Sequence, residues 1–393
     1  MDAHDRSRPL SPTPTASSAD HGSGVDVRIE RGCCWAYFAF DVGLSIDLDA
    51  AQRALSRSRP TREALSGQRR TPESLQFRPA PLQTTEETSP IRLGAFETAP
   101  SVQCTCFDFG AVAVAFRISL ADLALPALVD LAHELYECRA LLDAARQRVR
   151  ALVEVLGDAV ATPNIVDIVE DYVVFHAERW SVAGEPSDAV DATRILGCAP
   201  TIAAILRAAD ERLSDDEVSD ATASCVSYGR HDITIVDWNA ALVFDQRGQD
   251  TLTVLEFGNV ELLEMRFLDD RLDVVLDRAY QGLSRRPMFR AAREELRRLA
   301  ALQMESALLF EGINNAVKLV GDQFLARVYR LVARRFHLSE WDESVIRKLE
   351  TLQRLYEKFS DERNTRRMEV LEWIIIVLIA VSIVLPFVTG AGH

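Results

Sequence analysis

The hydrophobic residues in the first part of this chain form short runs that are typical of strands. Cys33–Phe40, with the sequence CCWAYFAF, predicts a strand that ends at Asp41–Gly43, and a helix is expected over Leu48–Leu55. Residues 101–118 predict two more strands around a turn at Asp108–Gly110. Both strand ends carry the motif aromatic–Asp–x–Gly, which indicates two similar sheet elements.

The middle of the chain mixes helical and strand periods. Helices are predicted from Pro126 to Gly157 and over Ala189–Ala209, whereas residues 165–180 fit either period. Thr234–Phe244 and Thr251–Phe257 are expected to form a hairpin, because turn-forming residues lie between them. Helical spacing then continues almost to the C-terminus. These patterns predict an α+β fold, in which an antiparallel or mixed sheet with flanking helices precedes long C-terminal helices.

The predicted organisation has five parts. Residues 1–24 are rich in Ser, Pro and Asp, which is typical of a disordered segment. The α+β domain is expected over residues 25–284, with residues 56–90 as an extended or loop segment. Its Phe77–Leu82 part fits a sheet edge, where proline is tolerated. The remaining parts are a helical region over residues 285–338, a helical stem over residues 339–370 and a transmembrane helix over residues 371–391.

The stem is predicted to be one helix that begins at Ser339, a favourable N-cap residue followed by acidic residues in the first turn. Its apolar seam has the 4-3-4-3 spacing of a heptad pattern. The seam consists of Val345, Leu349, Leu352, Tyr356 and Phe359. This spacing fits a coiled coil between copies of the chain, and it equally fits packing against the preceding helix, Phe324–Phe336.

The segment from Trp373 to Ala391 is 19 residues long and carries no charge. As a helix it spans roughly 28 Å, which matches the hydrocarbon core of a bilayer. Twelve of its residues are Ile, Leu, Val or Phe, which together favour insertion by about 5 kcal/mol. A buried core helix or an oligomer seam is the alternative. The expected anchor begins with Trp373, Ile374, Ile375, Ile376, Val377, Leu378 and Ile379.

Basic residues precede this segment, namely Lys358, Arg363, Arg366 and Arg367. The positive-inside rule therefore predicts a single-pass, tail-anchored protein whose N-terminal bulk is cytoplasmic. The expected location is a bacterial inner membrane. Residues 1–30 contain no hydrophobic secretory signal. The seven scattered cysteines are typical of a reducing compartment.

The net charge of −15 is unevenly distributed. Residues 278–367 contain 19 Lys or Arg against 12 Asp or Glu, a balance of +7, whereas residues 1–277 carry −20. Basic residues beside a bilayer attract anionic lipid by about 1 kcal/mol each. The paired arginines of the basic region are also candidates for phosphate in lipid or RNA. These pairs are Arg285–Arg286, Arg297–Arg298 and Arg334–Arg335.

Motifs for catalysis and metal binding are largely missing from the sequence. It contains no P-loop, no Gly-x-Gly-x-x-Gly and no Gly-x-Ser-x-Gly. Cys104 and Cys106 are too close for a zinc pair, and His176–Glu178 matches the His-x-Glu of zinc deaminases without their following cysteine pair. We therefore expect no metal, no cofactor and no identifiable small-molecule substrate.

Three polar clusters remain as candidates. Glu170–Asp171 is placed to line a groove, and Asp215–Glu217 fits a helix N-terminus or solvated turn. Gly229–Asp232, with Trp238–Asn239, fits either a polar site at strand ends or a turn with ordinary caps.

Three stretches resemble a known family. Arg366–Ile375 (RRMEVLEWII) resembles the C-terminal signature of the uncharacterised family named "required for meiotic nuclear division", in a bacterial-type form. Phe107–Val114 and Leu276–Tyr280 are similar to its earlier segments, so the resemblance covers about residues 101–390. It implies a membrane-tethered α+β domain that self-associates and has no established enzymatic activity. Eukaryotic members are mitochondrial membrane proteins, some of which support organellar translation.

These observations predict a non-catalytic binding and assembly scaffold held at a lipid bilayer as a homo-oligomer. One alternative is a membrane tether for ribosomes or RNA, which would use the basic helical region. A second alternative is an enzyme of unknown type that uses Glu170, Asp171 and His176.

Overall fold

The centre of the fold is a ten-stranded mixed sheet. The computed structural model describes residues 25–58, 79–284, 297, 301, 302, 304 and 323–355. The strand order is β10 (Cys225–Val226), β11 (Ile233–Val236), β12 (Ala240–Phe244), β8 (Val169–Val182), β1 (Val27–Asp41), β6 (Ala111–Ala124), β5 (Phe96–Cys106) and β3 (Leu82–Glu87). Neighbouring strands are antiparallel except for the parallel pair β12 and β8. The short β4 (Arg92–Leu93) pairs with β5, and β9 (Glu185–Pro186) pairs with β8. β2 (Ser45–Ile46) and β7 (Val160–Ala161) form a separate two-stranded sheet.

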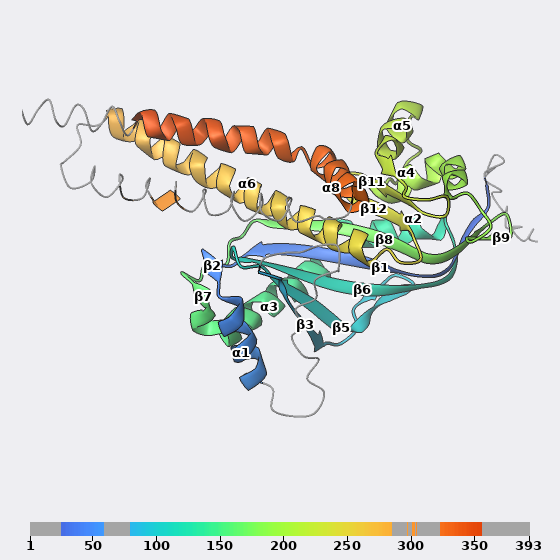
Figure 1. Ribbon diagram of the computed structural model, residues 1–393, viewed down its shortest axis with the longest axis horizontal. Coiled ribbons are helices and arrows are strands. Elements are labelled where there is room, and N and C mark those ends of the chain that lie inside the picture. The colour runs from blue at the N-terminus through green and yellow to red at the C-terminus, as the bar shows by residue number, and fades with distance from the viewer. Residues whose placement is uncertain are drawn as a thin grey trace, which may run out of the picture.

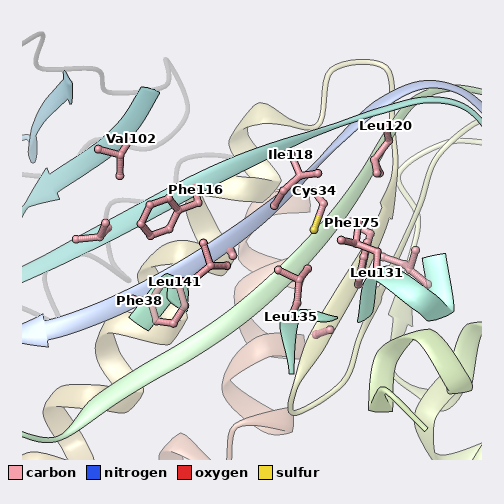
Figure 2. Packing of buried hydrophobic residues seen from close by; sticks show 14 of the residues in the cluster. Cys34, Phe38, Val102, Phe116, Ile118, Leu120, Leu131, Leu135, Leu141 and Phe175 are labelled. Carbon is pink, nitrogen blue, oxygen red and sulfur yellow. The ribbon is translucent and has the colours of Figure 1, made fainter. Parts of the chain in front are cut away.

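One face of the sheet contributes to the larger hydrophobic core. Cys34, Phe38, Phe116, Ile118 and Phe175 from the central strands are buried there (Figure 2). The helices packed on this face are α1 (Leu48–Ser58), α2 (Ala127–Leu135), α3 (Arg139–Leu156) and α4 (Ala199–Arg207). Alternation along a strand sends every second side chain to this face, which is why the apolar run of β1 supplies both cores.

The opposite face is covered by two helices from the C-terminal part of the chain. Tyr37, Tyr172 and Val174 from the strands pack there with the start of α6 (Gln249–Ser284) and with α8 (Gln323–Arg335). Figure 1 shows α6 and α8 on the side of the sheet opposite to α1 and α3. Three shorter helical elements are η1 (Gly157–Ala159), η2 (Ala192–Cys198) and α5 (Asp215–Ala223).

α6 continues beyond the sheet and forms a helical arm with the helix over residues 338–355 (Figure 1). At 36 residues, α6 is roughly 54 Å long. The two helices share a small core in which Met265, Leu268 and Leu272 meet Val345 and Leu352. The predicted stem seam therefore contacts α6 through its described residues, which include the half-buried Leu349. Tyr356 and Phe359 lie outside the described residues, so a coiled coil between copies stays a prediction.

Several predicted elements are confirmed. The structure contains the strand around Cys33–Phe40, the helix that begins at Leu48 and the hairpin around Asp108–Gly110. Residues 165–180, which fitted either period, contribute most of β8. The mixed sheet, the flanking helices and the C-terminal helices confirm the α+β fold class.

Three predicted elements are wrong. Thr251–Phe257 is the beginning of α6 and not a strand, because this turn of helix is buried on nearly all sides and its apolar run lacks a polar face. The helix predicted from Pro126 to Gly157 is two helices, since Tyr136 is extended and Glu137 adopts a positive φ of 49° between them. The helix predicted over Ala189–Ala209 is the 3-10 helix η2 followed by α4.

The predicted membrane segment lies outside the described residues. In the part of the chain that the structure describes, no helix is both long enough and apolar enough to cross a bilayer. The last described residue is Leu355. Residues 371–391 follow it, as do the basic residues Lys358, Arg363, Arg366 and Arg367.

Candidate functional site

A cavity of about 800 Å³ lies among the described residues, where α6 leaves the sheet. Loops at the ends of β1, β5 and β7 form its walls, and α6 closes one side. The residues that line it are Asp41, Gly43, Leu44, Ser45, Asp108, Phe109, Thr162, Asn164, Ile165, Val166, Asp167, Glu264, Phe267, Leu268 and Arg271. Four of these side chains carry a carboxyl group and one, Arg271, is basic, so acidic groups predominate in the cavity.

The two aromatic–Asp–x–Gly motifs of the sequence meet at this cavity. The amide of Val42 donates a hydrogen bond of 3.0 Å to the carbonyl of Gly110, and Ile46 donates one of 2.8 Å to the carbonyl of Asp108. Gly110 has a φ of +103°, and a Cβ at this position would lie 1.9 Å from the carbonyl oxygen of Gly43. The close approach of the two loops therefore requires glycine at position 110.

Burial changes the acid–base properties of the cavity. The Glu264 carboxyl is 3% exposed, and its Oε1 atom has no hydrogen-bond partner. Burial, and next the negative charge of Asp41, hold the pKa of Glu264 well above its usual range. Burial also raises the pKa of Asp108. Carboxyls of this kind can donate a hydrogen bond while protonated and attract a cation once ionised.

Glu170, one of the sequence candidates, lies on β8 under α6. It forms an ion pair with Arg266, and its carbonyl accepts a hydrogen bond of 3.2 Å from Asn259. Burial nevertheless raises the pKa of Glu170 to about 7, because the loss of hydration outweighs the attraction of Arg266. Burial also raises the pKa of Asp171.

His176 lies on the same strand as Glu170 but at a distance. Six residues along a strand separate them by roughly 20 Å. The His176 ring faces Cys33 of β1 instead, and Glu178 follows it two positions further along β8. The described structure therefore does not bring Glu170, Asp171 and His176 into one pocket.

A buried ion-pair network connects α8 to the sheet. The Asp237 carboxylate is fully buried and accepts hydrogen bonds from Arg207 at 2.9 Å and from Arg335 at 2.7 Å. Both arginines also bind Asp220 of α5, and their hydrogen bonds lower the pKa of Asp220 to about 2. Arg335 thus has a structural role, whereas the neighbouring Arg334 is exposed.

The other polar clusters have ordinary local roles. Asp215–Glu217 forms the first turn of α5, where Ser214 caps the helix by accepting a hydrogen bond of 3.2 Å from the Glu217 amide. Asp232 accepts hydrogen bonds from the amides of Tyr228 and Gly229 and so closes a turn. Both arrangements agree with the interpretation of these clusters as caps and turns.

Most of the predicted site residues lie outside the described residues. These are the anchor residues from Trp373 to Ile379, the membrane-proximal basic residues and Arg285, Arg286 and Arg298. The acidic cavity, by contrast, is described but was not predicted from the sequence. The sequence feature that could have indicated this cavity is the pair of aromatic–Asp–x–Gly motifs. The motifs do not indicate Glu264, because it belongs to a helix more than two hundred residues after the first motif.

The fold and the cavity define an α+β protein with a mixed sheet, a helical arm and an acidic pocket at the base of that arm. Residues 31–251 match the family described as "Uncharacterized protein MJ0711, N-terminal domain". This match covers more than half of the chain, so the chain belongs to that family. The expectation of an uncharacterised domain family is confirmed.

One relative is the uncharacterized protein MJ0711 of Methanocaldococcus jannaschii. It is 25% identical over 187 residues, which amount to 46% of this chain and 57% of the relative. The match therefore spans little more than half the length of that relative. No solved structure matches the chain.

Proposed function

We propose that this protein is a membrane-anchored, non-catalytic binding and assembly scaffold. The helical arm carries this proposal. The helix over residues 338–355 runs beside α6 in the part of the arm that extends beyond the sheet (Figure 1), and Leu355 is its last described residue. The apolar segment that begins at Trp373 follows 18 positions later. The helical arm begins on the sheet and precedes this apolar segment in the sequence. Such an arm would hold the sheet and its flanking helices, the sheet domain, at a distance from the bilayer.

The basic residues between the arm and the apolar segment support an orientation with the sheet domain on the cytoplasmic side. They are Lys358, Arg363, Arg366 and Arg367. A bacterial inner membrane is the location that we propose. The resemblance to the family required for meiotic nuclear division, which is strongest over residues 361–390, supports the same tethered arrangement.

Exposed apolar side chains on the arm support self-association. Val274 and Tyr280 of α6 are 42% and 51% exposed, and Ile346 of the neighbouring helix is 44% exposed. Burying such side chains between two copies would remove apolar surface from water. The acidic cavity at the base of the arm offers the scaffold a second binding surface, which favours a cationic group.

Extraction of membranes with alkaline carbonate tests the tether. We expect the full chain to remain with the pelleted membranes, and a variant that lacks residues 371–391 to appear in the supernatant. A variant that lacks residues 1–24 removes a segment of similar length and should behave like the full chain. Release of the full chain by carbonate would refute the tether. Crosslinking in detergent tests assembly, which a purely monomeric pattern would refute.

A membrane tether for ribosomes or RNA is the second candidate, favoured by one face of α8. Arg327, Arg330 and Arg334 lie three and four positions apart, so they form a stripe along the helix. Phosphate groups would bind such a stripe in a salt-dependent manner. Replacing the three arginines with glutamine should abolish salt-sensitive co-sedimentation with ribosomes, and absence of co-sedimentation by the unmodified chain would exclude this candidate.

A further inference from the structure

We propose that Cys33, His176 and Glu178 form a binding site for a divalent transition metal of the zinc type. The site lies on the α6 side of the sheet and uses described residues alone. It is independent of the proposed tether, because all three residues belong to β1 and β8.

The pairing of the two strands brings the donor atoms together. Cys33 lies directly opposite His176 in the antiparallel register. The Cys33 Sγ atom is 4.0 Å from the His176 Nδ1 atom, and one ligand atom from each of the three residues lies within 4.8 Å of the others. Around a tetrahedral zinc ion, sulfur and nitrogen ligands are separated by roughly 3.6 Å. A contraction of a few tenths of an ångström would therefore complete this part of the site.

The orientation of the His176 ring is the one that a metal ligand requires. Its Nε2 atom is 2.8 Å from the backbone carbonyl oxygen of Asp245. A carbonyl oxygen only accepts hydrogen bonds, so in the neutral ring the proton is on Nε2 and the lone pair is on Nδ1. That lone pair faces Cys33. Metal-binding histidines commonly donate their second ring N–H to a carbonyl or carboxylate in this way.

Two glycines make space for this arrangement. A Cβ at Gly32 would lie 2.3 Å from the carbonyl oxygen of His176, and a Cβ at Gly248 would lie 2.8 Å from its Nε2 atom. The register of β1 and β8 also shifts between Ile29 and Gly32, which marks a bulge beside Cys33. Bulges often occur next to functional sites, where they redirect side chains.

The donor set selects the class of metal. One thiolate, one imidazole and one carboxylate suit zinc and similar borderline ions better than calcium or magnesium. The two negative ligands would neutralise a divalent ion at a site where Cys33 and His176 are 2% and 5% exposed. Glu178 is bound to Arg31 through Oε2 at 2.8 Å, which leaves Oε1 for the metal. Its side chain is 27% exposed, so a fourth ligand can be water.

Cobalt(II) is a suitable probe, because a tetrahedral site with a thiolate ligand gives it a charge-transfer band and intense visible absorption. The metal-free full chain, purified in detergent, should bind one cobalt ion per chain with these spectra, and zinc should displace the cobalt. Cys33→Ser should remove the charge-transfer band, and His176→Gln and Glu178→Gln should weaken binding by about a hundredfold or more. Cys225→Ser, at an exposed cysteine, and His133→Gln should leave both the spectrum and the affinity unchanged.

Gly248→Ala provides a variant that retains all three ligands. The added methyl group would displace the His176 ring, so we expect weaker cobalt binding with an unchanged circular dichroism spectrum. If the Cys33 variant fails to fold, Glu178→Gln still tests the site, because Glu178 is the most exposed of the three ligands. The proposal is overturned if the unmodified chain binds no cobalt, or if the cobalt spectrum persists without Cys33. In that case Cys33 and His176 form only a weak hydrogen bond within the core.

Discussion

At the scale of single residues, the buried carboxylate of Asp237 has the clearest energetic role. It lies between Arg207 and Arg335 and is shielded from water. Asp237→Ala would leave two largely buried guanidinium groups without this partner. We expect the free energy of unfolding to fall by about 3–5 kcal/mol, measured by urea denaturation.

An exposed ion pair provides the control for this variant. Glu185 binds Arg194 at 3.0 Å, and their side chains are 59% and 44% exposed. Because exposed pairs are screened by water, Glu185→Gln should change stability by less than about 1 kcal/mol. Equal effects of the two variants would contradict a special role for the buried network.

Gly110 makes a second prediction at the residue scale. Gly110→Ala would place a methyl group against the backbone of Gly43 and would also impose an unfavourable φ. We expect a loss of about 3 kcal/mol or more in thermal or urea unfolding. Gly157→Ala is the control, since Gly157 has a φ of +50° with no atom within 4 Å of the added Cβ. It should cost only about 1–2 kcal/mol.

The sequence can identify single residues of a site but not the residues that lie beside them in the fold. The His176–Glu178 motif is visible in the sequence, but its partner Cys33 is 143 residues away from His176. Only the register of β1 against β8 brings them together, and a strand pattern does not specify which strands pair or in which register. The same limit applies to the acidic cavity, where Glu264 joins loops that precede it by a large part of the chain.

At the scale of elements, the strand patterns over residues 33–40 and 101–118 were reliable, and turn-forming residues mark the ends of these strands. The strand around Cys33–Phe40 and the hairpin around Asp108–Gly110 were predicted for this reason. The prediction of a strand over Thr251–Phe257 was wrong. The apolar residues of this segment are all buried in α6, namely Leu252, Val254, Leu255 and Phe257. A short apolar run has the same appearance in a buried helix and in a strand.

α6 carries buried carboxyls, and these make its packing sensitive to pH. Burial raises the pKa of Glu256 from 4.5 to about 7. Between these values the unfolded chain has released the proton and the folded protein retains it, so stability falls as pH rises and the loss is complete above about pH 7. Glu256→Gln removes this titration. Between about pH 4 and about pH 8, the variant should lose about 3 kcal/mol less than the unmodified chain.

Urea denaturation across this pH range measures the effect. Glu154→Gln, at an exposed position of α3, is the matched control and should leave the pH dependence unchanged. An unchanged pH dependence in Glu256→Gln would show that Glu256 does not titrate in this window.

At the scale of the whole molecule, charge separates the sheet domain from the region next to the proposed membrane. Residues 1–277 carry −20, whereas residues 278–367 carry +7. The sheet domain should therefore be repelled by anionic lipid, and the basic region should be attracted to it. This separation would favour one orientation of the molecule at a bilayer.

A chain that ends at residue 370 tests this attraction without the apolar segment. We expect it to bind weakly, and only at low salt, to vesicles that contain anionic lipid. It should not bind to neutral vesicles. Replacing Lys358, Arg363, Arg366 and Arg367 with glutamine removes four charges. At about 1 kcal/mol each, this should weaken binding by about a thousandfold.

The control replaces Arg53 and Arg57, which are exposed on α1 far along the chain from the basic region. These substitutions should leave vesicle binding unchanged in a sedimentation assay. Equal binding of neutral and anionic vesicles would contradict an electrostatic attraction.

The continuity of α6 has a mechanical consequence. A single helix both covers the sheet and extends outward, so no hinge separates the two parts within it. A pull on the outer end would act along the helix axis. All the contacts between the base of the helix and the sheet would then oppose the sliding of the helix at the same time, and they would not break one after another. The molecule would then transmit force as a stiff lever, and a tilt at one end would become a twist at the strands beneath the other.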